Sequence, residues 1–181
     1  MRWGAPQNGC ARGFTLPELM TTLAVTMIAL AVTVPNYLSL TRKNQATSVI
    51  NALVAEIQLT RSESLKRSAP VSMCPTADGA TCNTGGSPWL TSNSAERLIF
   101  VDDDGDGAVD AGETVIKRVA NGSPDMTLAV LNPVPAPTFL GFTRKGLLTS
   151  ASARIQITDA EGDSRCLQVH LTGRSELGAC P

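Results

Sequence analysis

The sequence predicts an α+β fold in which one long amino-terminal helix packs against antiparallel β-sheets. The first third of the chain is uniformly apolar and then amphipathic at helical spacing. The rest consists of short alternating runs separated by glycine-containing turns, a pattern typical of antiparallel strands. The length of 181 residues fits one domain of ordinary size behind an amino-terminal anchor.

Residues 14–35 form an apolar stretch about as long as a bilayer-spanning helix requires, roughly 20 residues. They follow a leader, residues 1–13, which carries Arg2 and Arg12 and no acidic residue. Glu18 is the one carboxylate of the stretch, and a lone charge inside a membrane costs at least roughly 2.5 kcal/mol. We therefore expect a transmembrane helix whose glutamate needs a partner.

The candidate processing point lies before the apolar core, whereas a secretory signal is cleaved after its core. Cleavage between Gly13 and Phe14 would leave the helix on the mature chain. The new ammonium of Phe14 would then lie one helical turn from the Glu18 carboxylate. In a filament of parallel helices, each carboxylate can pair with the ammonium of a neighbouring subunit. An uncleaved signal anchor with a stray glutamate is the simpler alternative.

An amphipathic helical spine is predicted over residues 36–68, with polar residues such as Glu56 on its outer faces. Pro35 removes a backbone hydrogen bond within the helix, so a bend or local melting is expected there. Pro70 predicts that the helix ends near Ala69. The apolar positions that recur at helical steps are Ala46, Val49, Ile50, Leu53, Ile57 and Leu65.

The remaining residues, 69–181, are predicted to form a β-rich globular domain of seven strands. The predicted strands are Val71–Cys74, Arg97–Val101, Thr114–Ala120, Met126–Leu131, Thr138–Phe142, Ala153–Thr158 and Cys166–Leu171.

Four cysteines remain once the leader is removed, and they are Cys74, Cys82, Cys166 and Cys180. An even number in a domain outside the cytoplasm indicates disulfides, and four cysteines allow three pairings. We favour pairing between sequence neighbours. Zinc is disfavoured because the spacings lack a C-x-x-C form and His170 is the one histidine. The mature chain has 13 basic and 16 acidic residues, hence a charge of 13 − 16 = −3, which argues against a general nucleic-acid coat.

The acidic segment from Asp102 to Glu113 has the ligand spacing of an EF-hand calcium loop, with Gly107 at the sixth place. Its flanks have strand character, so the loop is expected between two strands. A solvated acidic hairpin without metal is the alternative. The predicted calcium ligands are Asp102, Asp104, Asp106, the carbonyl of Ala108, Asp110 and Glu113.

The amino-terminal segment G-F-T-L-P-E and the apolar run after it resemble the class III signal of type IV pilins and of the pseudopilins of type II secretion. The resemblance implies that a prepilin peptidase cleaves after Gly13 and methylates the amino group of Phe14. It also implies that Glu18 serves filament assembly. Pro17 stands where the family usually has a branched apolar residue, and proline is compatible with the first helical turn.

Three later segments, residues 53–74, 97–119 and 166–180, resemble the GspH/FimT minor pilins and pseudopilins in order and spacing. The resemblance implies a minor subunit that initiates or caps a periplasmic pseudopilus or a type IV pilus. The implied partners are the prepilin peptidase, other pilin or pseudopilin subunits, the inner-membrane assembly platform and the lipid bilayer. The implied location is the bacterial inner membrane, crossed once, with the carboxyl-terminal domain in the periplasm.

A DNA-binding module at a pilus tip, serving natural transformation, is the alternative function. Some FimT-like members carry a basic G-R-x-R motif, but here Glu176 replaces its second arginine and would repel phosphate. The residues left for a basic patch are Arg144, Lys145, Arg165 and Arg174. An enzyme is not expected, because His170 has no evident acid or nucleophile beside it in the sequence.

Overall fold

The computed structural model describes residues 13–83, 96–120, 126–132, 138–149, 152–159, 161–178 and 180. Residues 1–12 of the predicted leader lie outside this described part. The chain divides into an amino-terminal unit that ends at Thr41 and a second unit, Arg42–Pro181.

A single helix, α1 (Leu16–Arg67), accounts for the first third of the chain, as predicted. It stays helical through Pro35, so local melting there does not occur, while the predicted bend stays a prediction. The helix ends two residues before Ala69, because Ser68 adopts a left-handed conformation with φ of 52°. Within the described residues, no helix combines the length and the apolarity needed to cross a bilayer. The transmembrane span predicted over residues 14–35 is thus not confirmed.

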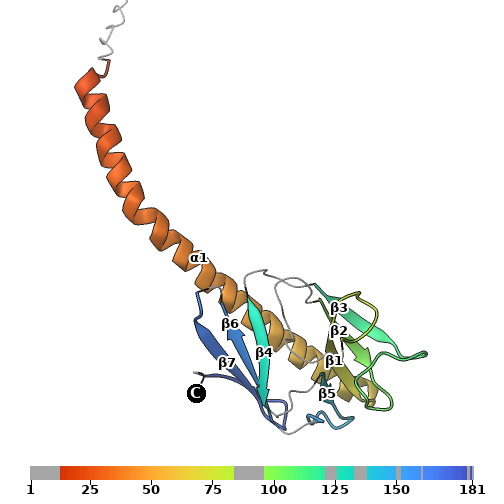
Figure 1. Cartoon of the computed structure of the whole chain (residues 1–181). Helices are drawn as coiled ribbons and strands as arrows, with labels where there is room; N and C mark the ends of the chain where they lie inside the picture. Colours follow the sequence, from red (N-terminus) through yellow and green to blue (C-terminus); the bar gives the residue numbers. More distant parts are fainter. Residues whose placement is uncertain are drawn as a thin grey trace, which may run out of the picture. The chain divides into compact units, whose positions relative to one another are not determined.

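Two antiparallel sheets form the second unit, with four described strands each (Figure 1). One sheet has the order β3-β2-β1-β5 and the other β4-β6-β7-β8. Seven of these strands correspond to predicted ones, with ends that differ by at most two residues. The eighth was missed because it is short and mostly exposed, and so lacks a clear apolar alternation. The strands are β1 (Val71–Thr76), β2 (Glu96–Val101), β3 (Val115–Val119), β4 (Thr127–Asn132), β5 (Leu140–Phe142), β6 (Ala153–Thr158), β7 (Ser164–Val169) and β8 (Ser175–Gly178).

The hydrophobic core lies between the carboxyl-terminal half of α1 and the two sheets (Figure 1). Leu53 and Ile57 of the helix are fully buried, as the helical periodicity predicts. Two expectations about this helix were wrong. Leu65 is about half exposed and lies against the turn at Gly146. Glu56, expected on an outer face, is buried.

Candidate functional site

Glu18 lies in the first turn of α1, close to the predicted processing point. The backbone N–H of Thr15 donates to Glu18 Oε2 at 3.4 Å, and the N–H of Leu19 donates to the Thr15 carbonyl at 3.1 Å. This is half of a capping box, in which a first-turn glutamate accepts from the N–H of the cap residue. The spacing T-x-x-E was the sequence signal for this contact, and our sequence analysis missed it. Glu18 thus also stabilises the positive end of the helix dipole.

The amino-terminal unit exposes a long apolar surface. Phe14 is 80% exposed. Threonine side chains within the amino-terminal half of the helix donate their hydroxyl groups to backbone carbonyls of the same helix. These polar groups therefore find their partners inside the helix. An exposed apolar surface of this extent marks an interaction with protein or membrane. Further exposed members are Leu16, Leu19, Met20, Leu23, Val25, Met27, Ile28, Leu30, Tyr37 and Leu40.

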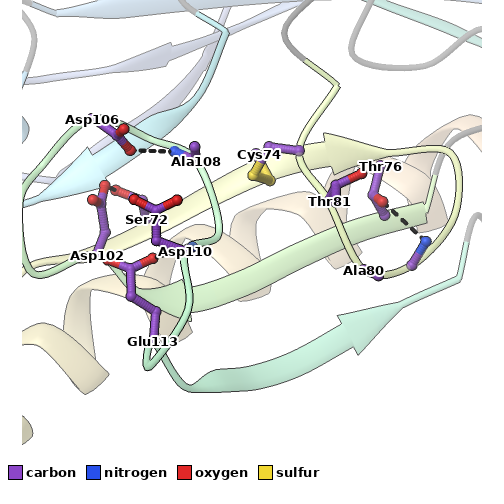
Figure 2. Close-up of a disulfide and its surroundings, with 12 residues drawn as sticks. Ser72, Cys74, Thr76, Ala80, Thr81, Asp102, Asp106, Ala108, Asp110 and Glu113 are labelled. Atoms are coloured by element: carbon purple, nitrogen blue, oxygen red, sulfur yellow. Dashed lines mark hydrogen bonds between the residues drawn. A yellow bond between two sulfur atoms is a disulfide. The ribbon is translucent and has the colours of Figure 1, made fainter.

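The acidic loop connects β2 to β3, as predicted, and brings three of its aspartates together. One carboxylate oxygen from each of Asp102, Asp104 and Asp106 lies within 4.8 Å of the other two. Asp102 is fully buried, whereas the other two are exposed. The Asp102 carboxylate accepts from the Ser72 hydroxyl (Figure 2). It also accepts from the N–H of Gly105 at 2.9 Å. The buried aspartate therefore fixes the start of the loop to β1.

Two glycines allow the loop to turn tightly. Gly105 and Gly107 have φ angles of 80° and 76°, in the left-handed region that favours glycine. A Cβ on Gly107 would lie 1.9 Å from Cδ1 of Phe139, whereas one on Gly105 would meet no atom within 4 Å. The glycine at the sixth place of the predicted calcium loop is therefore required both by the turn and by the packing of an aromatic ring.

The last two predicted ligands have other roles in the structure. Glu113 accepts the N–H of Asp103 at 2.9 Å through Oε1 and the N–H of Asp110 at 3.0 Å through Oε2. Glu113 thus holds the two ends of the loop together, and neither it nor Asp110 belongs to the converging cluster. The Ala108 N–H donates to Asp106 Oδ1 at 2.7 Å (Figure 2).

Both predicted disulfides are confirmed. Cys74 is bonded to Cys82, and Cys166 is bonded to Cys180, with Cα–Cα distances of 5.6 and 5.0 Å. The first bond closes a segment that contains Asp78. Figure 2 shows Cys74, Thr76, Ala80 and Thr81 of this segment. The Asp78 carboxylate accepts hydrogen bonds from the backbone N–H groups of residues 81 and 80, which have the largest effect, and from threonine hydroxyls. These bonds hold the pKa of the Asp78 carboxyl well below its usual range.

The four residues of the predicted basic patch lie at three separate places, and each place has acidic neighbours. Arg144 and Lys145 border a hollow whose other residues include two aspartates of the acidic loop. Arg165 borders a separate hollow that contains two other aspartates. Arg174 forms an ion pair with Glu176. The alternative function of DNA binding is not supported by this arrangement.

A buried ion pair that the sequence analysis missed joins the helix to the first sheet. Arg97 Nε donates to Glu56 Oε2 at 2.5 Å, and Nη2 donates to Oε1 at 2.9 Å. The two side chains are only 3% and 4% exposed. The available signal was the position of Glu56 three residues after the core residue Leu53, on the buried side of the helix.

Comparisons with known proteins agree with these features. The family model of the type II transport protein GspH matches residues 49–173, and that of the prokaryotic N-terminal methylation motif matches residues 9–34. The type IV minor pilin FimU of Pseudomonas aeruginosa is 21% identical, with a TM-score of 0.57 over 77% of this chain and 92% of that chain. The minor pseudopilin EpsH of Vibrio cholerae is 13% identical, with a TM-score of 0.46, and the match covers 76% of this chain and 96% of EpsH. No curated protein sequence matches.

The likeness to FimU confirms the predicted pilin-like α+β fold. The match to the methylation motif includes the predicted processing point and Glu18. The match to the GspH model covers more than half of the sequence and every described strand of the second unit except β8. This chain therefore belongs to the family of the type II transport protein GspH.

Proposed function

We propose that this chain is a minor subunit that helps to initiate or cap a periplasmic pseudopilus of type II protein secretion or a type IV pilus. The observation that carries the proposal is the exposed apolar helix surface that begins beside Phe14 and Glu18. Such a surface needs to be covered by lipid or by other helices. Membership of the GspH family and the likeness to a type IV minor pilin support a structural role rather than a catalytic one.

The proposed route to the filament follows from the same segment. A prepilin peptidase cleaves between Gly13 and Phe14 and methylates the new amino group. Residues 14–35 hold the mature subunit in the bacterial inner membrane, with the carboxyl-terminal domain in the periplasm. The assembly platform then transfers the helix into a filament among other pilin or pseudopilin subunits.

Glu18 is proposed to act in assembly by pairing with the ammonium of a neighbouring subunit. Among the described residues of its own chain, Oε2 accepts one long hydrogen bond, from Thr15. A carboxylate has about four lone-pair sites, so it can accept from a second donor while this cap persists. Pairing with an ammonium offsets the cost of placing each charge in an apolar helix bundle.

The test compares Glu18→Ala with Glu18→Gln in cells that assemble the filament. Glutamine keeps an oxygen for the helix cap and removes the charge, so it separates capping from pairing. We expect both variants to be cleaved, as measured by intact mass, and to be strongly depleted from sheared filaments on immunoblots. Glu161→Gln, a change at an exposed acid of the second unit, should be incorporated normally. Wild-type incorporation of Glu18→Gln would contradict the proposed pairing.

We also propose that the acidic loop binds calcium. The specific support is the convergence of Asp102, Asp104 and Asp106, since calcium takes six to eight oxygen ligands at one point. The carbonyl of Ala108, Asp110 and Glu113 are the further candidates. For Glu113 to bind the ion, its carboxylate must exchange its two N–H donors for the metal.

The calcium proposal is tested by calorimetric titration of the full chain in detergent. The expected result is binding heat, a raised melting midpoint, and loss of both in Asp104→Ala, which removes the ligand oxygen. Asp104 is the suitable ligand to change because it is exposed, whereas Asp102 also secures the loop to Ser72. Asp163→Ala, at an exposed acid outside the loop, is the control. The absence of heat and of a thermal shift at millimolar calcium would eliminate the site.

A further inference from the structure

An open hollow of about 490 Å³ lies between the acidic loop and the turn that follows β5, residues 143–147. Its charged lining consists of Asp103 and Asp104 from the loop and of Arg144 and Lys145 from the turn. None of these four side chains forms an ion pair in the part of the chain that the structure describes. Acidic and basic groups therefore share one hollow without pairing with each other, which leaves both kinds of charge available to a partner.

Both sides of this hollow are held in place by contacts of their own. In the turn, the N–H of Gly146 donates to the Thr143 carbonyl at 2.8 Å, and Arg61 Nε of α1 donates to the Gly146 carbonyl at 3.1 Å. On the other side, the buried Asp102 carboxylate fixes the acidic loop to β1. The backbone that carries the charges is therefore positioned before a partner binds, which lowers the ordering cost of association.

Exposed leucines surround the same turn. Leu147 lines the hollow and is 39% exposed. A Cβ atom on Gly146 would lie 3.0 Å from Cδ2 of Leu65, and the Leu171 carbonyl accepts the N–H of Leu148 at 2.9 Å. Leu65 and Leu171 are each about half exposed, so three of the five large exposed apolar side chains in the described part of the second unit gather here. Clustered apolar exposure of this kind marks an interaction surface.

We propose that this hollow docks a segment of a neighbouring pilin or pseudopilin subunit, which carries an apolar side chain between an acidic and a basic one. That the partner is such a subunit rests on the proposed filament role. Its acidic side chain pairs with Arg144 and Lys145. Its basic side chain pairs with Asp103, and its apolar side chain covers Leu147. An apolar centre with a charged rim is the usual composition of a protein interface, and the charges fix its register.

The mixed charge of the hollow favours a protein segment over an anionic lipid surface or a nucleic acid. Either of these would be attracted by Arg144 and Lys145. Each would also be repelled by the acidic loop, which carries six carboxylates between Asp102 and Glu113. A calcium ion would offset only two of these charges, so the loop stays negative in either state.

The first arm of the test maps the contact in cells that assemble the filament. The photoreactive amino acid benzoylphenylalanine replaces Leu147 in the full chain, and mass spectrometry identifies the adduct that forms on irradiation. We expect an adduct with another pilin or pseudopilin subunit, at a segment that carries both an acidic and a basic residue. Leu177 is the matched control position, because it is an exposed leucine of β8 outside the hollow. The same probe at this position should not label that segment.

The second arm tests the charges with the probe kept at Leu147. Arg144→Glu combined with Lys145→Glu should lower the adduct yield about tenfold or more, because attractive contacts become repulsive. Asp103→Lys should have the same effect through the other side of the hollow. Arg165→Glu should leave the yield unchanged, because Arg165 is exposed and lies outside the hollow. Changing the partner's cross-linked acidic residue to lysine should restore the yield of the doubly reversed variant.

Three results would overturn the docking site. They are an adduct with lipid or nucleic acid at Leu147, a subunit adduct whose yield neither charge reversal changes, and the lack of any adduct in filaments that contain the chain. All variants should keep the wild-type melting midpoint, because the changed side chains are exposed. The filament role is measured separately, as the presence of the wild-type chain in sheared filaments. If the wild-type chain is absent from them, the filament role fails and the docking site fails with it.

Discussion

The buried ion pair between Glu56 and Arg97 gives the largest stability effect that we expect from a single substitution. Removing one partner leaves the other charge buried and unpaired, which costs about 3–5 kcal/mol. A domain has about 5–15 kcal/mol of stability in total, so Glu56→Ala removes a large part of it. At roughly 3 °C per kcal/mol for a chain of this size, the midpoint should fall by roughly 9–15 °C.

A double-mutant cycle shows whether this cost comes from the orphaned charge. Glu56→Leu and Arg97→Met should each be strongly destabilising, whereas the double variant should lie within about 1–2 kcal/mol of the wild type. Differential scanning calorimetry of the full chain measures all four proteins. The control is Glu161→Ala, which breaks an exposed arginine–glutamate pair with Arg42 and should cost less than about 1 kcal/mol. The reasoning is refuted if the double variant loses the sum of the two single losses.

Three further predictions concern the turns and the disulfides. Gly105→Ala should lower the free energy of unfolding by about 1–2 kcal/mol through its left-handed backbone alone. Gly107→Ala should cost about 1–3 kcal/mol more, because its methyl group overlaps an aromatic ring. Equal losses of the two variants in urea unfolding would contradict this. Asp78 has a lowered pKa in the folded state, so its contribution is fully present above the unfolded pKa of about 3.9 and is lost as the pH falls through the lower folded pKa. Asp78→Ala should therefore lower the midpoint at pH 7, and the gap to the wild type should narrow below about pH 4; a gap of constant size down to pH 2 would refute this sign. Replacing Cys166 and Cys180 by serine should cost about 3 kcal/mol of stability, the value that loop entropy gives for a 14-residue separation. If this double substitution leaves the midpoint of chemical denaturation unchanged, the result counts against the bond.

The parts of the fold that were predicted correctly have local causes. Helical periodicity placed Leu53 and Ile57 in the core, because the repeat of an α-helix assigns each residue to a face without knowledge of the partner. The disulfides followed from short separations along the chain. The aspartates of the acidic loop converge because alternate side chains of a tight loop point to one place. Glu113 departs from that pattern because it satisfies two backbone N–H groups.

Glu56 shows why the rest was out of reach. Glu56 lies three residues after Leu53, which places it on the buried side of the helix. A glutamate there is ordinarily assigned to the edge of the polar face, because burying a charge without a partner is costly. The partner is 41 residues away in sequence and is brought close only when β2 pairs with β1 beneath the helix. Burial of Glu56 and burial of Arg97 therefore each depend on the other, and neither follows from its own neighbours.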